Sequence, residues 1–196
     1  MRVFQIVGVR KSGKTSTVEL LIGQLRTRGF RVGTVKSINC PVFSIDQRKD
    51  SNTGRHRKAG AEIVVAAGKN ETDFLFSHSL SIDRILKYLA LEELDFVIVE
   101  GGYQYNLPRI VCLKNTDELE ARRTDKTFAV SGMISNFMRK IEDLDVINAF
   151  EEPEKLIKLI MSEVPEVSFP IELLPRPECC RNYCGRCSEK GTGETC

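Results

Sequence analysis

Apolar and polar positions predict a strand, a helix and a second strand at the start of the chain. Residues 3–7 form a short apolar run that ends at Gly8, which predicts a buried strand followed by a turn. Apolar side chains then recur at helical spacing across residues 15–28, and Gly29 ends that predicted helix. Residues 31–35 form the next strand-like run. This order predicts an α/β fold with a mainly parallel sheet flanked by helices.

The middle of the chain predicts more elements of the same kinds. Residues 61–67 and 72–76 are strand-like runs on either side of a Gly-Lys-Asn-Glu turn, which predicts an antiparallel hairpin extension at the edge of the sheet. Residues 37–58 are polar and without periodicity, and ordered loops of this length are usually functional. The pattern also predicts helices over residues 82–91 and 154–161 and strands over residues 96–99, 109–113 and 127–130.

The character of the sequence changes after residue 164. Four prolines fall within residues 165–178 and disfavour a continuous helix or strand. The residues beyond them are rich in cysteine and poor in apolar side chains, so they need a source of order other than a core. We therefore expect one domain over residues 1–164, a proline-rich linker over residues 165–178 and a small cysteine-rich tail over residues 179–196.

Composition narrows the function classes. The chain has 196 residues, and its 29 Lys and Arg against 27 Asp and Glu leave a net charge of +2, which gives no reason to expect nucleic acid as a partner. No apolar run approaches the roughly 20 residues that a membrane span needs. Residues 1–10 lack the basic, apolar and small-residue regions of a secretory signal. We expect a cytoplasmic protein with no membrane partner.

The strongest chemical signal is a phosphate-binding loop. Residues 8–15 match the pattern G-x-x-x-x-G-K-[ST] and lie between a predicted strand and a predicted helix, as a P-loop requires. In such a loop the backbone N–H groups and the helix N-terminus face phosphate oxygens, the lysine reaches the β- and γ-phosphates, and the hydroxyl binds Mg²⁺. The motif predicts a P-loop NTPase fold. The residues expected to contact the nucleotide are Gly8, Arg10, Lys11, Ser12, Gly13, Lys14, Thr15 and Ser16.

A carboxylate is expected near those phosphates. Glu100 directly follows the predicted strand at residues 96–99, and the carboxyl ends of parallel strands line the ligand crevice of an open α/β sheet. It could hold a Mg²⁺-bound water or orient an attacking one. Asp46, in the long polar stretch, is a further magnesium candidate beside Thr15 and Glu100. Lys14 and Glu100 are the catalytic candidates for any hydrolysis of the nucleotide.

Residues 55–58 form a basic run, Arg-His-Arg-Lys, which fits either a solvated loop or helix start, or an anion clamp. Guanidinium groups suit bidentate phosphate contacts. Arg55 is therefore a candidate nucleotide contact. Asp50 lies just before this run and is another.

Five motifs occur in a particular order: the P-loop, Gly-Thr-Val-Lys at 33–36, Asp-Gln-Arg-Lys-Asp-Ser at 46–51, Arg-His-Arg-Lys-Ala-Gly-Ala at 55–61 and Val-Glu-Gly at 99–101. This order resembles MobB, the molybdopterin-guanine dinucleotide biosynthesis protein B family, over roughly residues 1–160. The resemblance implies a P-loop protein, usually a homodimer, that binds GTP with Mg²⁺. It also implies an accessory role toward molybdopterin and the MobA-like guanylyltransferase that attaches GMP to it. We expect weak intrinsic GTP hydrolysis.

The preference for GTP over ATP rests on the resemblance. Residues 114–117 read Lys-Asn-Thr-Asp, which is near the Asn-Lys-x-Asp signature of many GTPases but does not match it. Residues 37–40, Ser-Ile-Asn-Cys, stand where the family tends to show histidines, and residues 100–103 read Glu-Gly-Gly-Tyr in place of Glu-Gly-Phe-Lys.

The tail predicts a metal site. Five of the seven cysteines lie within residues 179–196, and a tetrahedral site needs four thiolates. Zn²⁺ would take Cys180, Cys184, Cys187 and Cys196, with Cys179 as the alternative ligand. Counted from Cys179, the spacing also matches the front half of a plant-type iron–sulfur motif, so an iron–sulfur cluster is the other candidate. A tail with reduced thiols and no metal is the third possibility.

Two further functions use the same features. A small-molecule kinase would employ the P-loop for phosphoryl transfer and the stretch containing Asp46, Asp50 and Arg55 as a lid. A GTP-switched metallochaperone would carry its cargo on the cysteine tail and release it with the nucleotide cycle.

Overall fold

The computed structural model describes residues 1–38 and 51–168. In chain order its elements are β1 (Arg2–Gly8), α1 (Lys14–Thr27), β2 (Val32–Lys36), α2 (Asn52–Lys58), β3 (Ile63–Ala67), β4 (Thr72–Phe76), α3 (Ile82–Ala90), β5 (Phe96–Glu100), β6 (Arg109–Cys112), η1 (Thr116–Glu118), β7 (Thr127–Ser131), η2 (Met133–Asn136), β8 (Lys140–Ile141), β9 (Leu144–Asp145) and α4 (Pro153–Glu163).

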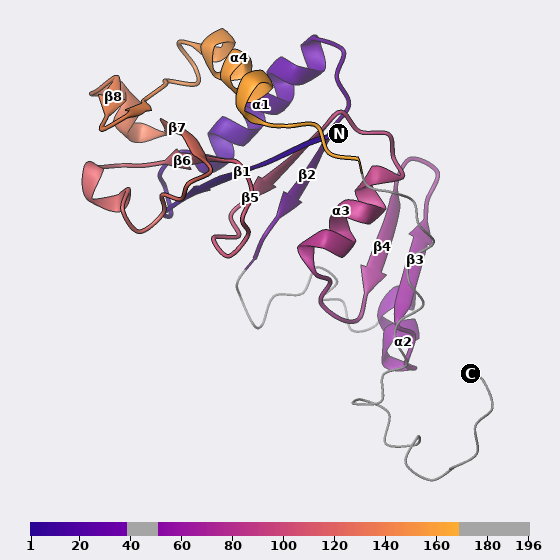
Figure 1. Ribbon diagram of the computed structural model, residues 1–196. Helices are drawn as coiled ribbons and strands as arrows, with labels where there is room; N and C mark the ends of the chain where they lie inside the picture. Colours follow the sequence, from indigo (N-terminus) through magenta and orange to yellow (C-terminus); the bar gives the residue numbers. More distant parts are fainter. Residues whose placement is uncertain (39–50, 169–196) are drawn as a thin grey trace, which may run out of the picture.

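Five parallel strands in the order β2-β5-β1-β6-β7 form the central sheet. β1 lies between β5 and β6, with Ile6 opposite Glu100 and Gly8 opposite Cys112. β5 pairs with β2 so that Lys36 is also opposite Glu100. The carboxyl ends of these strands therefore meet at one edge of the sheet, where the chain turns from β1 into α1 (Figure 1). The predicted α/β fold of the P-loop NTPase type is confirmed.

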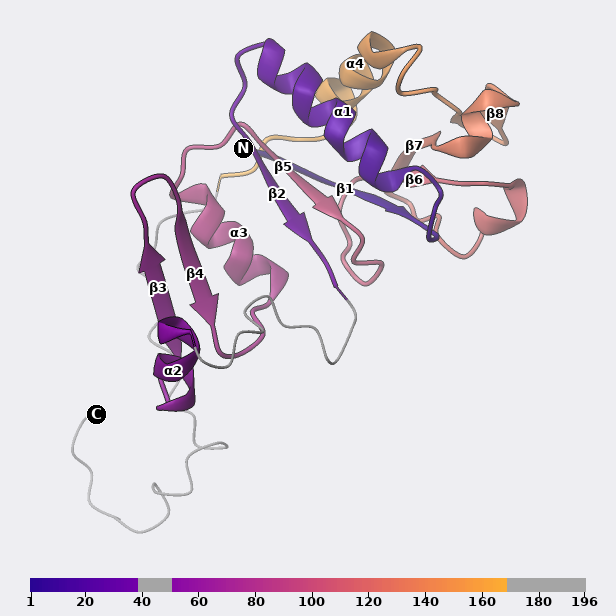
Figure 2. The same cartoon turned by 180° about the vertical axis from the view of Figure 1, so that it is seen from behind.

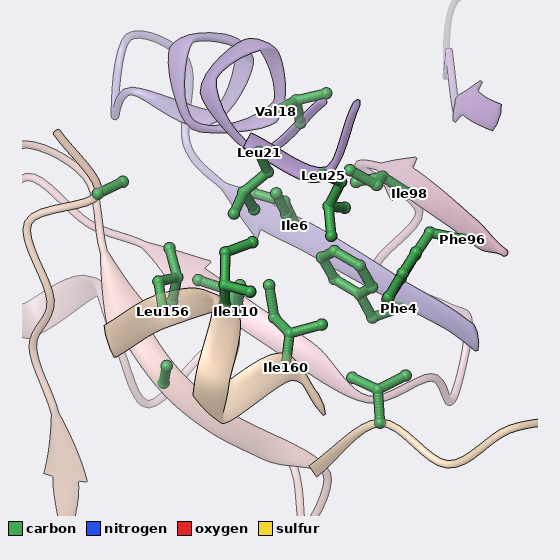
Figure 3. Packing of buried hydrophobic residues seen from close by; sticks show 14 of the residues in the cluster. Phe4, Ile6, Val18, Leu21, Leu25, Phe96, Ile98, Ile110, Leu156 and Ile160 are labelled. Atoms are coloured by element: carbon green, nitrogen blue, oxygen red, sulfur yellow. The ribbon is translucent and has the colours of Figure 1, made fainter. Parts of the chain in front are cut away.

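Helices cover both faces of this sheet because successive strand residues point to opposite sides. On one face, Leu21 and Leu25 of α1 and Ile160 of α4 pack with Phe4 and Ile6 of β1, and all five side chains are fully buried (Figure 3). Each such side chain contributes about 1.5–3 kcal/mol relative to exposure. This packing holds α1 firmly against the strand that precedes the P-loop.

The other face of the sheet packs against α3. Leu86 of α3 contacts Val3, Val97 and Val99, which alternate along their strands with the residues of the first face. Arg84 N–H donates to the Ser81 hydroxyl at 3.3 Å and so caps α3. The sheet is therefore enclosed between α1 and α4 on one side and α3 on the other.

The predicted hairpin is present, but it is not an edge of the central sheet. β3 and β4 pair antiparallel, with Val65 opposite Phe74, and form a two-stranded sheet of their own. Figures 1 and 2 show this hairpin beside α3, with α2 at its base. The expectation of an edge position was wrong: in the part of the chain that the structure describes, β2 is the outermost strand on that side.

Some further features differ from the sequence pattern or were absent from it. Residues 52–58, within the stretch read as aperiodic, form helix α2, and Gly54 N–H donates to the Ser51 hydroxyl at 3.0 Å at its start.

Residues 165–168 run back to β1, where Val167 N–H donates to the Met1 carbonyl at 2.9 Å. Residues 169–196 lie outside the described residues. Among the helices that the structure describes, none is long and apolar enough to cross a membrane.

Candidate functional site

The P-loop, residues 8–15, wraps closely around the end of β1. Gly13, the residue before α1, has a φ of 95° and Lys11 one of 61°, both in the left-handed region. A Cβ at Gly8 would lie 2.2 Å from the carbonyl oxygen of Cys112 on β6. The first glycine is therefore required by strand packing and the second by backbone conformation.

The loop is held in place by the turn that follows β7. Met133 N–H donates to the Ser12 carbonyl at 3.1 Å, and Ile134 N–H donates to the Leu113 carbonyl at 3.0 Å. Gly132, at this turn, has a φ of 85°, and a Cβ there would lie 2.2 Å from the Ser12 carbonyl oxygen. The close approach of these two backbones requires glycine at position 132.

The side chains of the P-loop have different surroundings. Lys14 Nζ donates to the Val9 carbonyl at 2.6 Å, so the ammonium folds over its own loop. Ser12 is fully buried, and its hydroxyl has no hydrogen-bond partner within the described ranges. The exposed members of the predicted set are Arg10, Lys11, Thr15 and Ser16.

Glu100 meets the P-loop at the end of β5. Its side chain is 12% exposed, and Oε1 accepts hydrogen bonds from Thr15 Oγ1 at 2.9 Å and from Lys36 Nζ at 2.5 Å. Thr15 and Glu100, both predicted from the sequence, are thus brought together. Lys36 joins them because β2 and β5 are parallel neighbours whose last residues are in register.

A glycine turn after β5 brings Tyr103 onto the P-loop. Gly101 and Gly102 have φ values of 83° and 74°. The Tyr103 hydroxyl accepts from Gly8 N–H at 3.2 Å and donates to the Gly8 carbonyl. The guanidinium carbon of Arg122 lies 5.8 Å from the centre of the Tyr103 ring. Tyr103 therefore ties the first glycine of the loop to the segment that carries Glu100.

Arg109 supports this segment from inside the fold. Its guanidinium is buried and donates to the carbonyls of Tyr105 at 2.6 Å and Arg122 at 3.3 Å. Gln5 Nε2 also donates to the Tyr105 carbonyl, at 3.1 Å. Burial lowers the pKa of Arg109, and the charge of Asp125 opposes that shift.

The thiol of Cys112 lies beneath the P-loop. It is fully buried, with Sγ 3.7 Å from Thr17 Oγ1 on α1. Burial raises the pKa of Cys112 to about 12, although the hydrogen bond with Thr17 acts in the opposite direction. The thiol is therefore protonated at neutral pH and fills space between β6 and α1.

Other predicted site residues are not brought to this site. Arg55 lies on α2, which packs against β3, and Figures 1 and 2 both show α2 at the opposite end of the molecule from α1. The remaining candidates lie outside the described residues: Asp46, Asp50, Cys179, Cys180, Cys184, Cys187 and Cys196.

Three residues of the site were not assigned a role from the sequence. Lys36 precedes the long polar stretch, and only the order of the strands shows that it faces Glu100. Tyr103 follows the Gly-Gly pair that allows its return to Gly8, so that pair was the available signal. Gly132 follows an apolar strand, and its isolated position after that strand was the signal for a close backbone approach.

Comparison with known proteins gives consistent similarities. Residues 3–136 match the family described as molybdopterin guanine dinucleotide synthesis protein B, MobB. The chain is 34% identical over 121 residues to a Methanocaldococcus jannaschii protein assigned as a molybdopterin-guanine dinucleotide biosynthesis adapter, covering 60% of this chain and 49% of that protein. It is 30% identical over 108 residues to the molybdopterin-guanine dinucleotide biosynthesis adapter protein of Haemophilus influenzae, covering 54% of this chain and 60% of that protein.

The fold is similar to a solved structure as well. The crystal structure of Bacillus subtilis MobB superposes with a TM-score of 0.69 at 22% identity, covering 85% of this chain and 100% of that one. In sequence, the chain spans about half the length of the Methanocaldococcus relative.

Proposed function

The chain belongs to the MobB family of molybdopterin guanine dinucleotide synthesis proteins, and from this premise we propose that it binds Mg²⁺–GTP through its P-loop and serves as an adapter for the guanylyltransferase that attaches GMP to molybdopterin. The observation that carries the proposal is the meeting of Thr15 and Glu100 at the N-terminus of α1, beside Lys14. A hydroxyl, a carboxylate and an ammonium are the groups that a magnesium-bound triphosphate requires.

The backbone of the P-loop would hold the phosphates. α1 is a 14-residue helix whose first N–H groups have no partner within the helix and point toward the loop. Lys14 Nζ already reaches across the loop to the Val9 carbonyl at 2.6 Å. Exchanging this neutral acceptor for an anionic phosphate adds the attraction between two opposite charges. Lys14 therefore favours the bound state.

The residues present fit a magnesium ion. Mg²⁺ prefers oxygen ligands and usually keeps several of its waters. The Thr15 hydroxyl and the Glu100 carboxylate are hydrogen-bonded to each other, with Oγ1 2.9 Å from Oε1. These two groups would hold the ion, directly or through a bound water, and the ion would neutralise charge on the triphosphate.

The surroundings of Glu100 favour an adapter with weak GTP hydrolysis. Oε1 is shared between the Lys36 ammonium and the Thr15 hydroxyl, and the side chain is largely buried. A carboxylate held in this way pairs charge and positions a metal ion but has little freedom to orient an attacking water. We therefore expect the nucleotide to be held and presented rather than turned over rapidly.

The hairpin supports a homodimer. Ile63, Val65 and Phe74 lie on one face of it, with exposed fractions of 44%, 49% and 63%, and Val65 is directly opposite Phe74. An isolated two-stranded hairpin is only marginally stable, and a contiguous exposed apolar patch is typical of an interface. We propose that a second copy of the chain covers this face.

Sedimentation analysis of Phe74→Lys tests the dimer. The variant is expected to be a monomer, because the lysine would place a charge in the apolar interface. Glu71→Lys, in the turn between β3 and β4, is the control and is expected to remain dimeric. A dimeric Phe74→Lys would contradict this interface.

The cysteine tail remains a proposed metal site. It lies outside the described residues, so its support is the spacing of Cys180, Cys184, Cys187 and Cys196, with Cys179 as the alternative ligand. Metal analysis and an absorption spectrum of anaerobically purified protein distinguish Zn²⁺ from an iron–sulfur cluster. A metal-free preparation would contradict both.

A reconstituted reaction tests the adapter role. Guanylyltransferase, molybdopterin and limiting GTP are combined with the wild-type chain, with Lys14→Ala, or with Lys158→Ala, which removes the same charge from an exposed position of α4. We expect the wild type and Lys158→Ala to accelerate product formation and Lys14→Ala not to do so. Equal acceleration by Lys14→Ala would mean that any adapter role does not use the nucleotide site.

A further inference from the structure

A small cavity opens beside the P-loop. Its volume is about 210 Å³, and it lies between the first turn of α1, the turn after β7 and the segment before α4. The lining residues that matter below are Gly13, Ser16, Met133, Asn136, Asn148 and Phe150. Gly13 and Ser16 belong to the phosphate-binding end of α1, so the cavity adjoins the proposed nucleotide site.

The size and surface of the cavity suit one planar ring system. Its volume of about 210 Å³ is below the roughly 300 Å³ at which pockets begin to enclose whole drug-sized ligands. Met133 and Phe150 border it with exposed fractions of 48% and 63%, so both side chains are accessible to a ligand. A thioether and a phenyl ring both pack favourably on the faces of a heteroaromatic ring.

The polar end of the cavity has a defined hydrogen-bonding direction. Asn148 is buried, and its Oδ1 accepts from the backbone N–H groups of Phe150 at 3.0 Å and Glu151 at 3.4 Å. The amide orientation of Asn148 is thereby set, and its Nδ2 donates to Asn136 Oδ1 at 3.1 Å. Asn136 must then present its own Nδ2, which can only donate.

This donor has no partner within the described ranges of the chain. The hydroxyl of Ser135 donates instead to the Gly132 carbonyl at 2.6 Å, and that of Ser131 to the Ile147 carbonyl at 2.8 Å. Asn136 is exposed at the mouth of the cavity, and its Nδ2 is the amide donor that remains for a ligand. A ring that carries a carbonyl acceptor at its edge complements it, whereas a ring with an amine there leaves two donors facing each other.

We propose that this cavity holds the base of the bound nucleotide and that Asn136 selects guanine over adenine by donating from Nδ2 to O6. The inference rests on the proposed nucleotide-binding function and adds the position of the base and the atom that distinguishes it. Guanine presents the O6 acceptor where adenine presents the N6 amine. Residues 114–117, which are near a guanine signature in sequence, do not line the cavity, and Lys114 N–H donates to Glu118 Oε2 at 2.9 Å.

Calorimetric titration of the full chain in Mg²⁺ tests the selecting atom. GTP and ITP carry O6, whereas ATP and 2,6-diaminopurine riboside triphosphate carry an amine at that position. Because an unpaired donor at a binding site is penalised, we expect the first pair to bind about tenfold or more tightly than the second. Equal affinities for GTP and ITP would assign the preference to O6 rather than to the 2-amino group; an ITP affinity as low as that of ATP would overturn the proposal.

Substitutions of Asn136 provide a second test of the proposed selection of the base. Asn136→Ala should bring the ratio of GTP to ATP affinity close to one. Asn136→Asp keeps an oxygen for Asn148 and turns the donor into an acceptor, so it should favour ATP and the diaminopurine nucleotide. Asn106→Asp makes the same change at an exposed residue that lines a separate cavity, and it should leave the ratio unchanged.

Phe150→Ala distinguishes stacking of a side chain on the base from selection of guanine over adenine. Loss of the ring should weaken all four nucleotides by a similar factor, about tenfold, since stacking tolerates any base. An unchanged GTP-to-ATP ratio in both Asn136 variants would overturn the proposed selection while leaving nucleotide binding intact. A wild-type chain that binds none of the four would overturn the proposed function itself.

Discussion

Gly132→Ala tests whether the turn after β7 holds the P-loop in its binding shape. Gly132 has φ 85° and ψ −156°, a region that is essentially restricted to glycine. A Cβ there would lie 2.2 Å from the Ser12 carbonyl oxygen, the same oxygen that accepts from Met133 N–H. Alanine therefore requires both a strained backbone and a displacement of the P-loop.

The expected cost has two parts. The backbone conformation contributes about 1–3 kcal/mol, and the overpacking against the Ser12 carbonyl adds about 1–3 kcal/mol. Gly29→Ala is the matched control, because Gly29 has a φ of 86° and a Cβ there would meet nothing within 4 Å. That variant should lose only about 1 kcal/mol. We expect the free energy of unfolding of Gly132→Ala to fall by about 4 kcal/mol in total.

Urea denaturation and GTP titration measure the two consequences. Gly132→Ala should unfold at a clearly lower urea concentration than Gly29→Ala, and the fraction that is folded should bind GTP more weakly because the Ser12 carbonyl has moved. Gly29→Ala should bind GTP as the wild type does. If the two variants were equally stable and bound GTP alike, the contact between the β7 turn and the P-loop would not matter.

Further expected outcomes concern three other side chains. Thr15→Val removes one proposed magnesium ligand, so GTP affinity should no longer rise when Mg²⁺ is added to a chelated sample; a rise equal to that of the wild type would contradict the ligand assignment. Tyr103→Phe loses both hydrogen bonds to Gly8 and should lower the free energy of unfolding by about 1 kcal/mol in urea, whereas no change would mean that the hydroxyl does not hold the loop. Burial raises the pKa of Cys112 from its ordinary value of 9.0 to about 12. Above pH 9 the unfolded chain therefore releases a proton that the folded chain keeps, and stability falls as the pH rises from 9 toward 12, by at most about 1.4 kcal/mol per pH unit. The urea midpoint of the wild type should thus decline more steeply over that range than that of Cys112→Ala, and parallel declines would refute the assignment.

The P-loop and the elements around it could be predicted because their signals are local. A strand that ends at Gly8, a helix that begins at Lys14 and the motif between them depend on residues that are close in sequence. Glu100 was predictable for a related reason, since the carboxyl end of a parallel strand must lie at the ligand edge of the sheet. These features required no knowledge of which strands are neighbours.

The rest of the site depends on long-range pairing. Lys36 faces Glu100 only because β2 adjoins β5, and Asn136 faces Asn148 only because the segment before α4 returns to the end of β7. The predicted edge position of the hairpin was wrong for the same reason. The sequence pattern indicates that β3 pairs with β4, but it does not show whether either strand also pairs with the central sheet. The charge argument for Arg55 could not give its position, and its helix packs on β3, away from the P-loop.

We propose above all that this chain binds Mg²⁺–GTP through residues 8–15. The most direct test is a calorimetric titration of GTP into the wild type, Lys14→Ala and Lys158→Ala under identical Mg²⁺ concentrations. We expect saturable binding of one nucleotide per chain by the wild type and by Lys158→Ala, and loss of binding by Lys14→Ala. GTP binding by Lys14→Ala with the affinity of the wild type would contradict it.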